Sequence, residues 1–170
     1  YPTPIVEVNS ETICDGNVAT LTATPSLGGG TYIWSPGGET SPTISVSPST
    51  TTTYNVLYTL NGCEASALGE VTVNPVPNIV IGDETICEGE SVTLTAMPDI
   101  IGGDFLWSNA NTSASISVSP SSTSVYSVLY TIDGCQNIAT ANVNVNEIPT
   151  LSFINDTICE GESGTINTIP

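Results

Sequence analysis

Hydrophobic residues alternate with threonine, serine and asparagine along most of the chain. This period of two is typical of half-buried β-strands, because successive side chains of a strand point to opposite faces. In the segment 19–23, for example, Ala and Leu alternate with Thr. The alternation predicts short strands at 19–23, 32–34, 44–46, 54–58 and 71–73, and again at 92–96, 105–107, 116–118, 126–130 and 143–145.

Turn-forming residues separate these segments. Gly-rich stretches occur at 26–30 and 99–103. Asn61-Gly62 and Asp133-Gly134 tolerate positive φ and therefore predict tight hairpins. Six or seven short strands in about 72 residues are typical of a small β-sandwich. We expect two such sandwiches with these cores: Trp34 with Leu21, Ile44, Val46 and Val56, and Trp107 with Leu94, Ile116, Val118 and Val128. On the outer faces, which are mostly polar, Leu57 and Leu129 are the apolar exceptions.

The chain repeats itself. The hexapeptide at 11–16, Glu-Thr-Ile-Cys-Asp-Gly, returns with one conservative change at 84–89 and with two at 156–161, so the successive offsets are 73 and 72 residues. Self-similarity at a fixed period indicates a tandem repeat protein. We predict a first repeat at 1–75, a second repeat at 76–148 and the start of an incomplete third repeat at 149–170.

The composition excludes several kinds of chemistry. The 170 residues include no Lys, Arg or His, and 17 acidic residues give a net charge of −17. Without histidine the chain has no imidazole to act as a base or as a metal ligand, and without lysine it has no amine nucleophile. Without lysine and arginine it cannot neutralise a nucleic-acid backbone. No run of about 18 apolar residues predicts membrane insertion. We therefore expect no enzyme activity, no cofactor and no nucleic-acid partner.

A family resemblance supports the sandwich prediction. The segment 90–96 is similar to the B strand of an immunoglobulin domain, with Ala96 in place of the usual cysteine, and Trp107 follows 11 residues later, as in that family. Tyr54-Asn55-Val56 resembles the Tyr-x-Cys of strand F, with Val in place of Cys. The resemblance implies an all-β fold of tandem immunoglobulin-like β-sandwiches arranged as a linear array, in which strand C′ and also strand D are missing between strands C and F.

A narrower resemblance concerns the whole repeat. The pattern Ile-Cys-x-Gly, then Tyr/Phe-x-Trp, Tyr-x-Val and Gly-Cys, resembles immunoglobulin-like and PKD-like repeats in giant surface proteins of gliding, Bacteroidota-type bacteria. These proteins include gliding-motility adhesins exported by the type IX secretion system. The resemblance implies an extracellular location on the bacterial cell surface.

The five cysteines allow more than one pairing. An extracellular context favours disulfides, and each full repeat has one cysteine near its start and one after strand F: Cys14 with Cys63, and Cys87 with Cys135. Strands of roughly 3.3 Å per residue place the two cysteines of one repeat at opposite ends of its sandwich. Pairs within a repeat and free thiols stay open. The prediction we favour is an inter-repeat bridge between Cys14 and Cys135, with Cys63, Cys87 and Cys159 pairing to repeats outside this sequence.

Acidic residues cluster at the first turn of each repeat. Calcium binds through six to eight oxygen ligands, many of them carboxylates, so Glu11, Asp15, Glu88 and Glu90 are weak calcium candidates. No ordered calcium-loop spacing accompanies them, and solvated turns are the alternative that we favour over a metal site. Asp156-Thr157-Ile158 resembles an O-glycosylation signal of the same bacteria, which makes Thr157 a glycosylation candidate.

The sequence thus predicts a mechanical role. We expect a structural stalk segment of a long extracellular adhesin fibre, and the resemblance implies a gliding-motility adhesin. Its partners would be the neighbouring repeats of the same chain and an unknown surface ligand at a distal tip. The alternative is a glycan- or protein-binding immunoglobulin-like module attached to a secreted protein, which would use loops such as 26–30 and 99–103. Those loops have similar lengths and modest chemistry, which favours the stalk.

Overall fold

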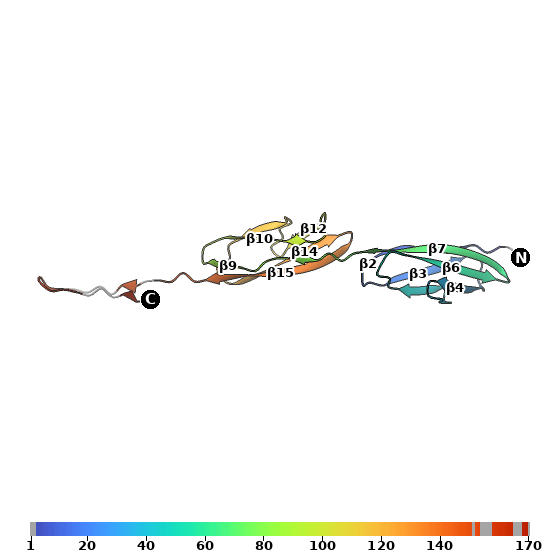
Figure 1. Ribbon diagram of the computed structural model, residues 1–170, viewed down its shortest axis with the longest axis horizontal. Coiled ribbons are helices and arrows are strands. Elements are labelled where there is room, and N and C mark those ends of the chain that lie inside the picture. Colours follow the sequence, from blue (N-terminus) through green and yellow to red (C-terminus); the bar gives the residue numbers. More distant parts are fainter. Residues whose placement is uncertain (1–2, 151, 154–157, 165–167, 170) are drawn as a thin grey trace. The chain divides into compact units, whose positions relative to one another are not determined.

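A computed structural model describes residues 3–150, 152–153, 158–164 and 168–169, and the elements in this part of the chain are all β-strands (Figure 1). Two compact units are present. One comprises Tyr1–Ile79, Pro98–Asp104 and Leu129–Ile138, and the other comprises Val80–Met97, Phe105–Val128 and Ala139–Pro170. The units therefore do not follow the sequence repeats, because segments of the second repeat pack with the first. The predicted repeat boundaries stay a prediction.

The first repeat forms two sheets. The smaller sheet has the order β1 (Val6–Val8), β3 (Ala19–Pro25) and β5 (Thr43–Val46). The larger has the order β2 (Glu11–Cys14), β7 (Cys63–Asn74), β6 (Thr52–Leu60) and β4 (Thr31–Ser35). Strands β2 and β7 are parallel, with Cys14 beside Asn74, whereas β6 is antiparallel to both of its neighbours. The described residues 36–42 form no strand between β4 and β5, as the resemblance implied for strand C′.

Alternation along the strands builds the first core. In β3 the side chains of Ala19, Leu21 and Ala23 are buried and the threonines between them are exposed. Trp34 is 1% exposed, which confirms the assignment of its strand, and its indole Nε1 donates a hydrogen bond to the Ser41 carbonyl at 2.9 Å. Burial of the large aromatic ring supplies much of the hydrophobic stabilisation. The cluster also contains Val6, Ile44, Tyr54, Val56, Tyr58 and Val71.

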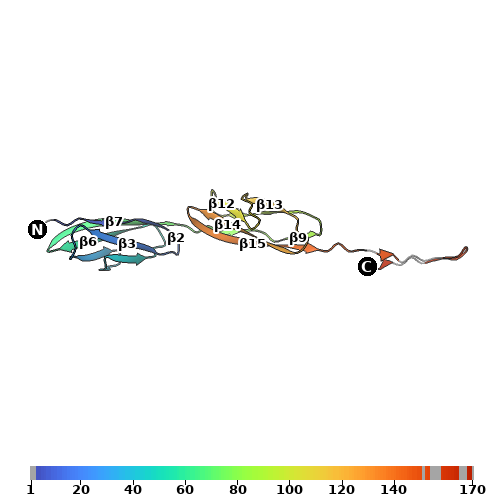
Figure 2. The same cartoon turned by 180° about the vertical axis from the view of Figure 1, so that it is seen from behind.

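The second repeat follows the same plan (Figure 2). Its larger sheet has the order β12 (Asp104–Trp107), β14 (Ser124–Ile132), β15 (Cys135–Asn146) and β9 (Glu84–Cys87), and β9 is parallel to β15 as β2 is to β7. Two-stranded sheets pair β10 (Val92–Thr95) with β13 (Ser115–Val118), and β8 (Ile79–Val80) with β11 (Met97–Pro98). Farther along the chain, β16 (Ser152–Phe153) pairs with β17 (Thr168–Ile169). Buried residues of the repeat include Leu94, Trp107, Ile116, Val118, Val128, Tyr130 and Val143.

Two details differ from the sequence prediction. Val46, expected in the first core, is only half-buried and packs at its edge. Leu57 and Leu129, expected as exposed exceptions, are half-buried. For Leu57 the reason is its place in the sheet: Ile33 of β4 and Ser66 of β7 lie directly opposite it and can shield part of its side chain. Cross-strand neighbours are close enough to do this.

Candidate functional site

A disulfide joins two cysteines that are far apart in the sequence. Cys14, the last residue of β2, bonds to Cys135, the first residue of β15, with their Cα atoms 5.6 Å apart. This is the inter-repeat pair favoured from the sequence. Both residues lie in the same compact unit. The bond closes a loop of 121 residues, so it covalently ties the opening of the first repeat to a hairpin of the second.

Two asparagines reinforce this tie. The Asn74 side-chain amide donates to the Asp133 carbonyl at 2.9 Å, and the Cys135 sulfur lies 3.8 Å from the Asn74 carbonyl oxygen. The Asn137 amide donates to the Pro77 carbonyl at 3.0 Å. In both hydrogen bonds the side-chain amide of one repeat donates to a backbone carbonyl of the other repeat. The hairpin is thereby held by polar contacts on both sides of the disulfide.

The local fold explains how the hairpin presents its cysteine. Asp133 and Gly134 have φ values of 49° and 79°, and Asn61 and Gly62 have 50° and 81°. Positive φ at both central residues is the requirement of a type I′ hairpin turn, and these residue types adopt it most readily. Cys135 and Cys63 therefore stand at the same position of equivalent hairpins. Cys135 is buried, whereas Cys63 is half-buried.

The remaining cysteines are reduced. Cys63, Cys87 and Cys159 are free thiols, and the last two are exposed. Their pairing to repeats outside this sequence stays a prediction. Cys87 occupies the place in β9 that Cys14 occupies in β2, beside Asn146 instead of Asn74. The same turn follows both cysteines, with Asn17 and Glu90 donating their backbone N–H to the respective cysteine carbonyl.

The acidic calcium candidates bond to their own chain. Glu11 Oε2 accepts the Thr20 N–H at 3.0 Å, and Glu90 Oε2 accepts the Cys87 N–H at 2.9 Å. Asp15 and Glu88 donate their backbone N–H groups to the carbonyls at the ends of β7 and β15. Within the described part of the chain, no three or more metal-binding side chains come together. The calcium assignment of these four acids stays a prediction.

Sequence reasoning missed two loop-anchoring tyrosines. The Tyr58 hydroxyl donates to the Leu27 carbonyl at 2.6 Å and accepts the Gly30 N–H at 2.8 Å. Tyr130 does the same with Ile100 and Gly103, at 2.7 and 2.8 Å. The recurrence of both tyrosines at an offset of 72, with a Gly-rich loop before each, is the signal that could have revealed this role. Both loops considered for ligand binding are thus fastened in the same way.

One candidate site finds no structural test, and one finding concerns the membrane. Thr157, the glycosylation candidate, lies outside the described residues. Among the described residues, no helix has the length and apolar character needed to cross a membrane.

Known structures resemble this fold. The extracellular domains 3–5 of Drosophila OTK are 16% identical, and the match covers 82% of this chain and 60% of theirs with a TM-score of 0.51. An I-band fragment of titin is 10% identical, with coverage of 86% and 67% and a TM-score of 0.52. Immunoglobulin domains 1–4 of Sidekick-1 are 14% identical, with coverage of 84% and a TM-score of 0.48, and this chain spans 48% of their length.

The similarities to OTK and to the titin fragment establish the fold. The chain is all-β and carries immunoglobulin-like repeats in tandem. No model of a known protein family matches the chain, and no curated protein matches its sequence.

Proposed function

We propose that this chain is a stalk segment of a long extracellular adhesin fibre, in which immunoglobulin-like repeats follow one another in a linear array. The observation that carries the proposal is the Cys14–Cys135 disulfide with its flanking asparagine bonds. A bridge from the start of one repeat to a hairpin of the next gives a pulling force a covalent path that bypasses the chain between two cysteines whose sequence separation is 121. Such a bypass suits a module that transmits load.

The fastened loops support the stalk over a recognition module. Tyr58 and Tyr130 anchor loops 26–30 and 99–103 through equivalent hydrogen bonds. Binding loops commonly differ between domains of one scaffold, because function is carried by loop variation. The same anchor in both repeats is typical of a spacer that is copied along a fibre.

Location and partners form part of this proposal. Disulfides persist in oxidising compartments outside the cytosol, and the resemblance to gliding-motility adhesins favours a location on a bacterial cell surface. Neighbouring repeats are then its direct partners, and a distal tip carries the ligand. We propose no catalytic role, because the chain has no His, Lys or Arg to supply a base, a nucleophile or an anion clamp.

Force spectroscopy on the full chain tests the load-bearing role. With the disulfide intact, only 170 minus 121, or 49 residues, can be extended, which is about 160–180 Å at roughly 3.3–3.6 Å per residue. The reduced chain should lengthen to about 560–610 Å. We expect the oxidised chain to hold, without lengthening further, a load that unfolds the reduced chain.

A binding screen against glycans and surface proteins provides the opposing outcome. Saturable binding that is lost after substitution of loops 26–30 and 99–103, in a chain that retains its disulfide, would favour the recognition module and contradict the stalk. A chain that unfolds at the same load in both redox states would also contradict it.

A further inference from the structure

The second repeat ends in an uncovered copy of the site that holds the hairpin on the first. On the first repeat, Cys14, Asn74 and Pro77 contact the hairpin of residues 133–137. At an offset of 72 or 73 residues stand Cys87, Asn146 and Pro149. Asn146 is paired with Cys87 across parallel strands, as Asn74 is with Cys14. We refer to Cys87, Asn146 and Pro149 as the open site.

Burial shows that the open site lacks its cover. Pro77 is fully buried, whereas Pro149 is exposed. Asn74 and Cys14 are half-buried, whereas Asn146 and Cys87 are exposed. Ile148, next to Pro149, is 58% exposed. The same residue types in the same strand register are therefore covered where the hairpin of residues 133–137 contacts them and exposed at the open site.

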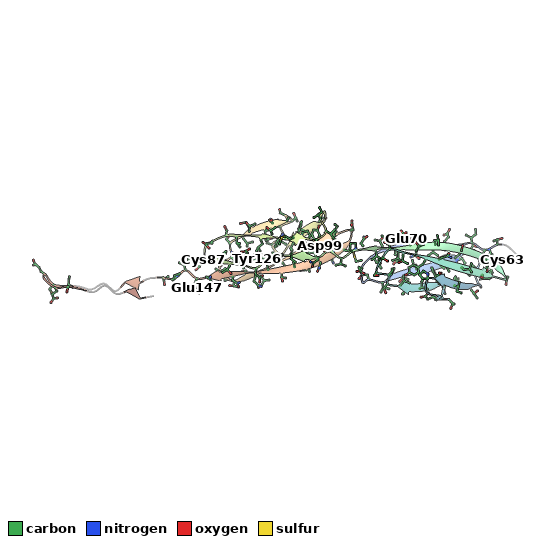
Figure 3. All side chains as sticks on the ribbon, in the orientation of Figure 1. Cys63, Glu70, Cys87, Asp99, Tyr126 and Glu147 are labelled. Carbon is green, nitrogen blue, oxygen red and sulfur yellow. A yellow bond between two sulfur atoms is a disulfide. The ribbon has the colours of Figure 1, made fainter. Side chains whose placement is uncertain are left out.

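A cavity lies at the open site. It measures about 630 Å³ and is lined by Glu88, Ser121, Glu147, Ile148, Pro149 and Thr150. Glu88 directly follows Cys87, and Glu147 directly follows Asn146, so the cavity adjoins both polar members of the site. Cys87 and Glu147 lie at the same end of the larger sheet of the second repeat (Figure 3).

We propose that the open site is a docking and disulfide-forming site for the hairpin between the last two strands of a following immunoglobulin-like repeat. The hairpin that fits has Asn or Asp, then Gly, then Cys, as at 61–63 and 133–135. Its first residue presents a carbonyl to the Asn146 amide, and its cysteine reaches Cys87. The bond forms by oxidation of the two thiols to a disulfide, with loss of two protons and two electrons to a thiol oxidant or a disulfide exchange partner.

The occupied site on the first repeat supports this occupant. The backbone after Cys87 makes the same hydrogen bond as the backbone after Cys14. Glu88 donates its N–H to the Asn146 carbonyl at 2.9 Å, as Asp15 does to the Asn74 carbonyl. Docking therefore requires no new strand pairing in the second repeat. Cys63 stands in the equivalent hairpin of the first repeat. Each full repeat therefore carries a cysteine-bearing hairpin at one end and a site for such a hairpin, with its own cysteine, at the other.

Extension of the full chain tests the proposal. Pro170 aligns with Pro98 at an offset of 72, so a second copy of residues 99–148 added after Pro170 completes a third repeat in register. An Ile138→Val change in the added copy marks its peptides by mass. After alkylation of free thiols and cleavage at glutamate, mass spectrometry should find the added copy of Cys135 bonded to Cys87, and Cys63 and Cys159 alkylated.

The original Cys14–Cys135 bond serves as an internal folding control. If the hybrid third repeat does not fold, a second version in which residues 149–170 are replaced by a full copy of 77–148 provides the same test. A bond from the added cysteine to Cys63, a free Cys87 in a folded chain, or, in the first version, a bond to Cys159 would overturn the proposal.

A matched pair of variants tests the role of the amide. In the extended chain, Asn146→Ala should lower the equilibrium constant for the Cys87 bond, measured in a glutathione redox buffer, by about two- to tenfold, as expected for one lost hydrogen bond. Asn144→Ala, an exposed position two residues earlier in β15, should leave the constant unchanged. Equal effects of the two variants would contradict recognition of the hairpin by Asn146.

Discussion

The two repeats share their interiors and differ at their cysteines. Trp34 and Trp107 are 1% and 2% exposed, and each indole donates to a serine carbonyl, at 2.9 and 2.8 Å. Cys14, in contrast, is oxidised and Cys87 is a free, exposed thiol. The residues of each repeat therefore form its own tryptophan-centred core. The oxidation state of Cys14 or Cys87, in contrast, depends on whether a hairpin of the next repeat supplies a partner. Paired substitutions at equivalent positions can separate the two.

The largest difference should follow from removal of the terminal cysteines. Cys14→Ser opens a loop of 121 residues, which in the chain-entropy model lowers the free energy of unfolding by about 4–5 kcal/mol. Cys87→Ser should change it by less than about 0.5 kcal/mol, as expected of an exposed position. Denaturant unfolding monitored by tryptophan fluorescence measures both. Equal effects of the two variants would show that the bridge does not stabilise the fold.

Truncation of the core should affect the two repeats alike. Trp34→Ala and Trp107→Ala should each cost about 3–5 kcal/mol, because both side chains are fully buried and leave a cavity. Calorimetry of each variant reports the cost, and Trp→Phe at each position is the milder control. A cost at one position several kcal/mol below the other would contradict equivalent cores.

The sequence predicted these shared interiors for a physical reason. A period of two assigns each strand residue to one face, and the repetition supplies two readings of every strand, so Leu21 and Trp34 could be placed in the core. The direction and length of the strands also predicted that Cys14 and Cys63 lie at opposite ends of their sandwich. Cys135 of the next repeat was therefore the predicted partner of Cys14. These inferences depend on strand geometry and on the repetition of the sequence.

The polar contacts of the hairpin could not be predicted in this way. Asparagine is common along the chain, and no one-dimensional pattern distinguishes Asn74 and Asn137 from the others. Whether an amide reaches a carbonyl depends on distances between segments that are 59 or 60 residues apart. Likewise, the alternation predicts that Tyr58 is buried but does not identify the loop that its hydroxyl binds.

Removal of those hydroxyls should have a smaller effect, equal in both repeats. Tyr58→Phe and Tyr130→Phe each leave a loop carbonyl and a loop N–H without their side-chain partner, at a cost of about 1–3 kcal/mol. Amide hydrogen exchange at Gly30 and Gly103 should speed up in the respective variant. Tyr126→Phe, four residues before Tyr130 on β14, is the control. Unchanged exchange at both glycines would show that the loops are held by other means.

The smallest expected difference concerns alkaline pH and one acidic residue of the first repeat. Burial raises the pKa of Tyr54 above its ordinary value of 10.0, and the Glu39 carboxylate raises it further. The backbone carbonyl of Glu39 accepts the backbone N–H of Trp34. In the second repeat the backbone carbonyl of Asn111, a neutral residue, accepts the backbone N–H of Trp107. Glu39→Asn therefore gives the first repeat the residue type of the second at this position.

A raised pKa means that the folded chain holds the phenolic proton more tightly than the unfolded chain does, so the contribution of Tyr54 to stability is complete below pH 10 and is lost as the pH rises through the folded pKa. Glu39→Asn should lower the pKa of Tyr54, but burial should keep it above 10. The loss of stability should accordingly begin at the same pH and end at a lower one. Tyrosinate absorbance, taken as the difference from a Tyr54→Phe chain, measures the pKa. Because Glu39 is the lesser of the two causes, a fall of the pKa to 10 or below would show that the carboxylate, and not burial, dominates at this position.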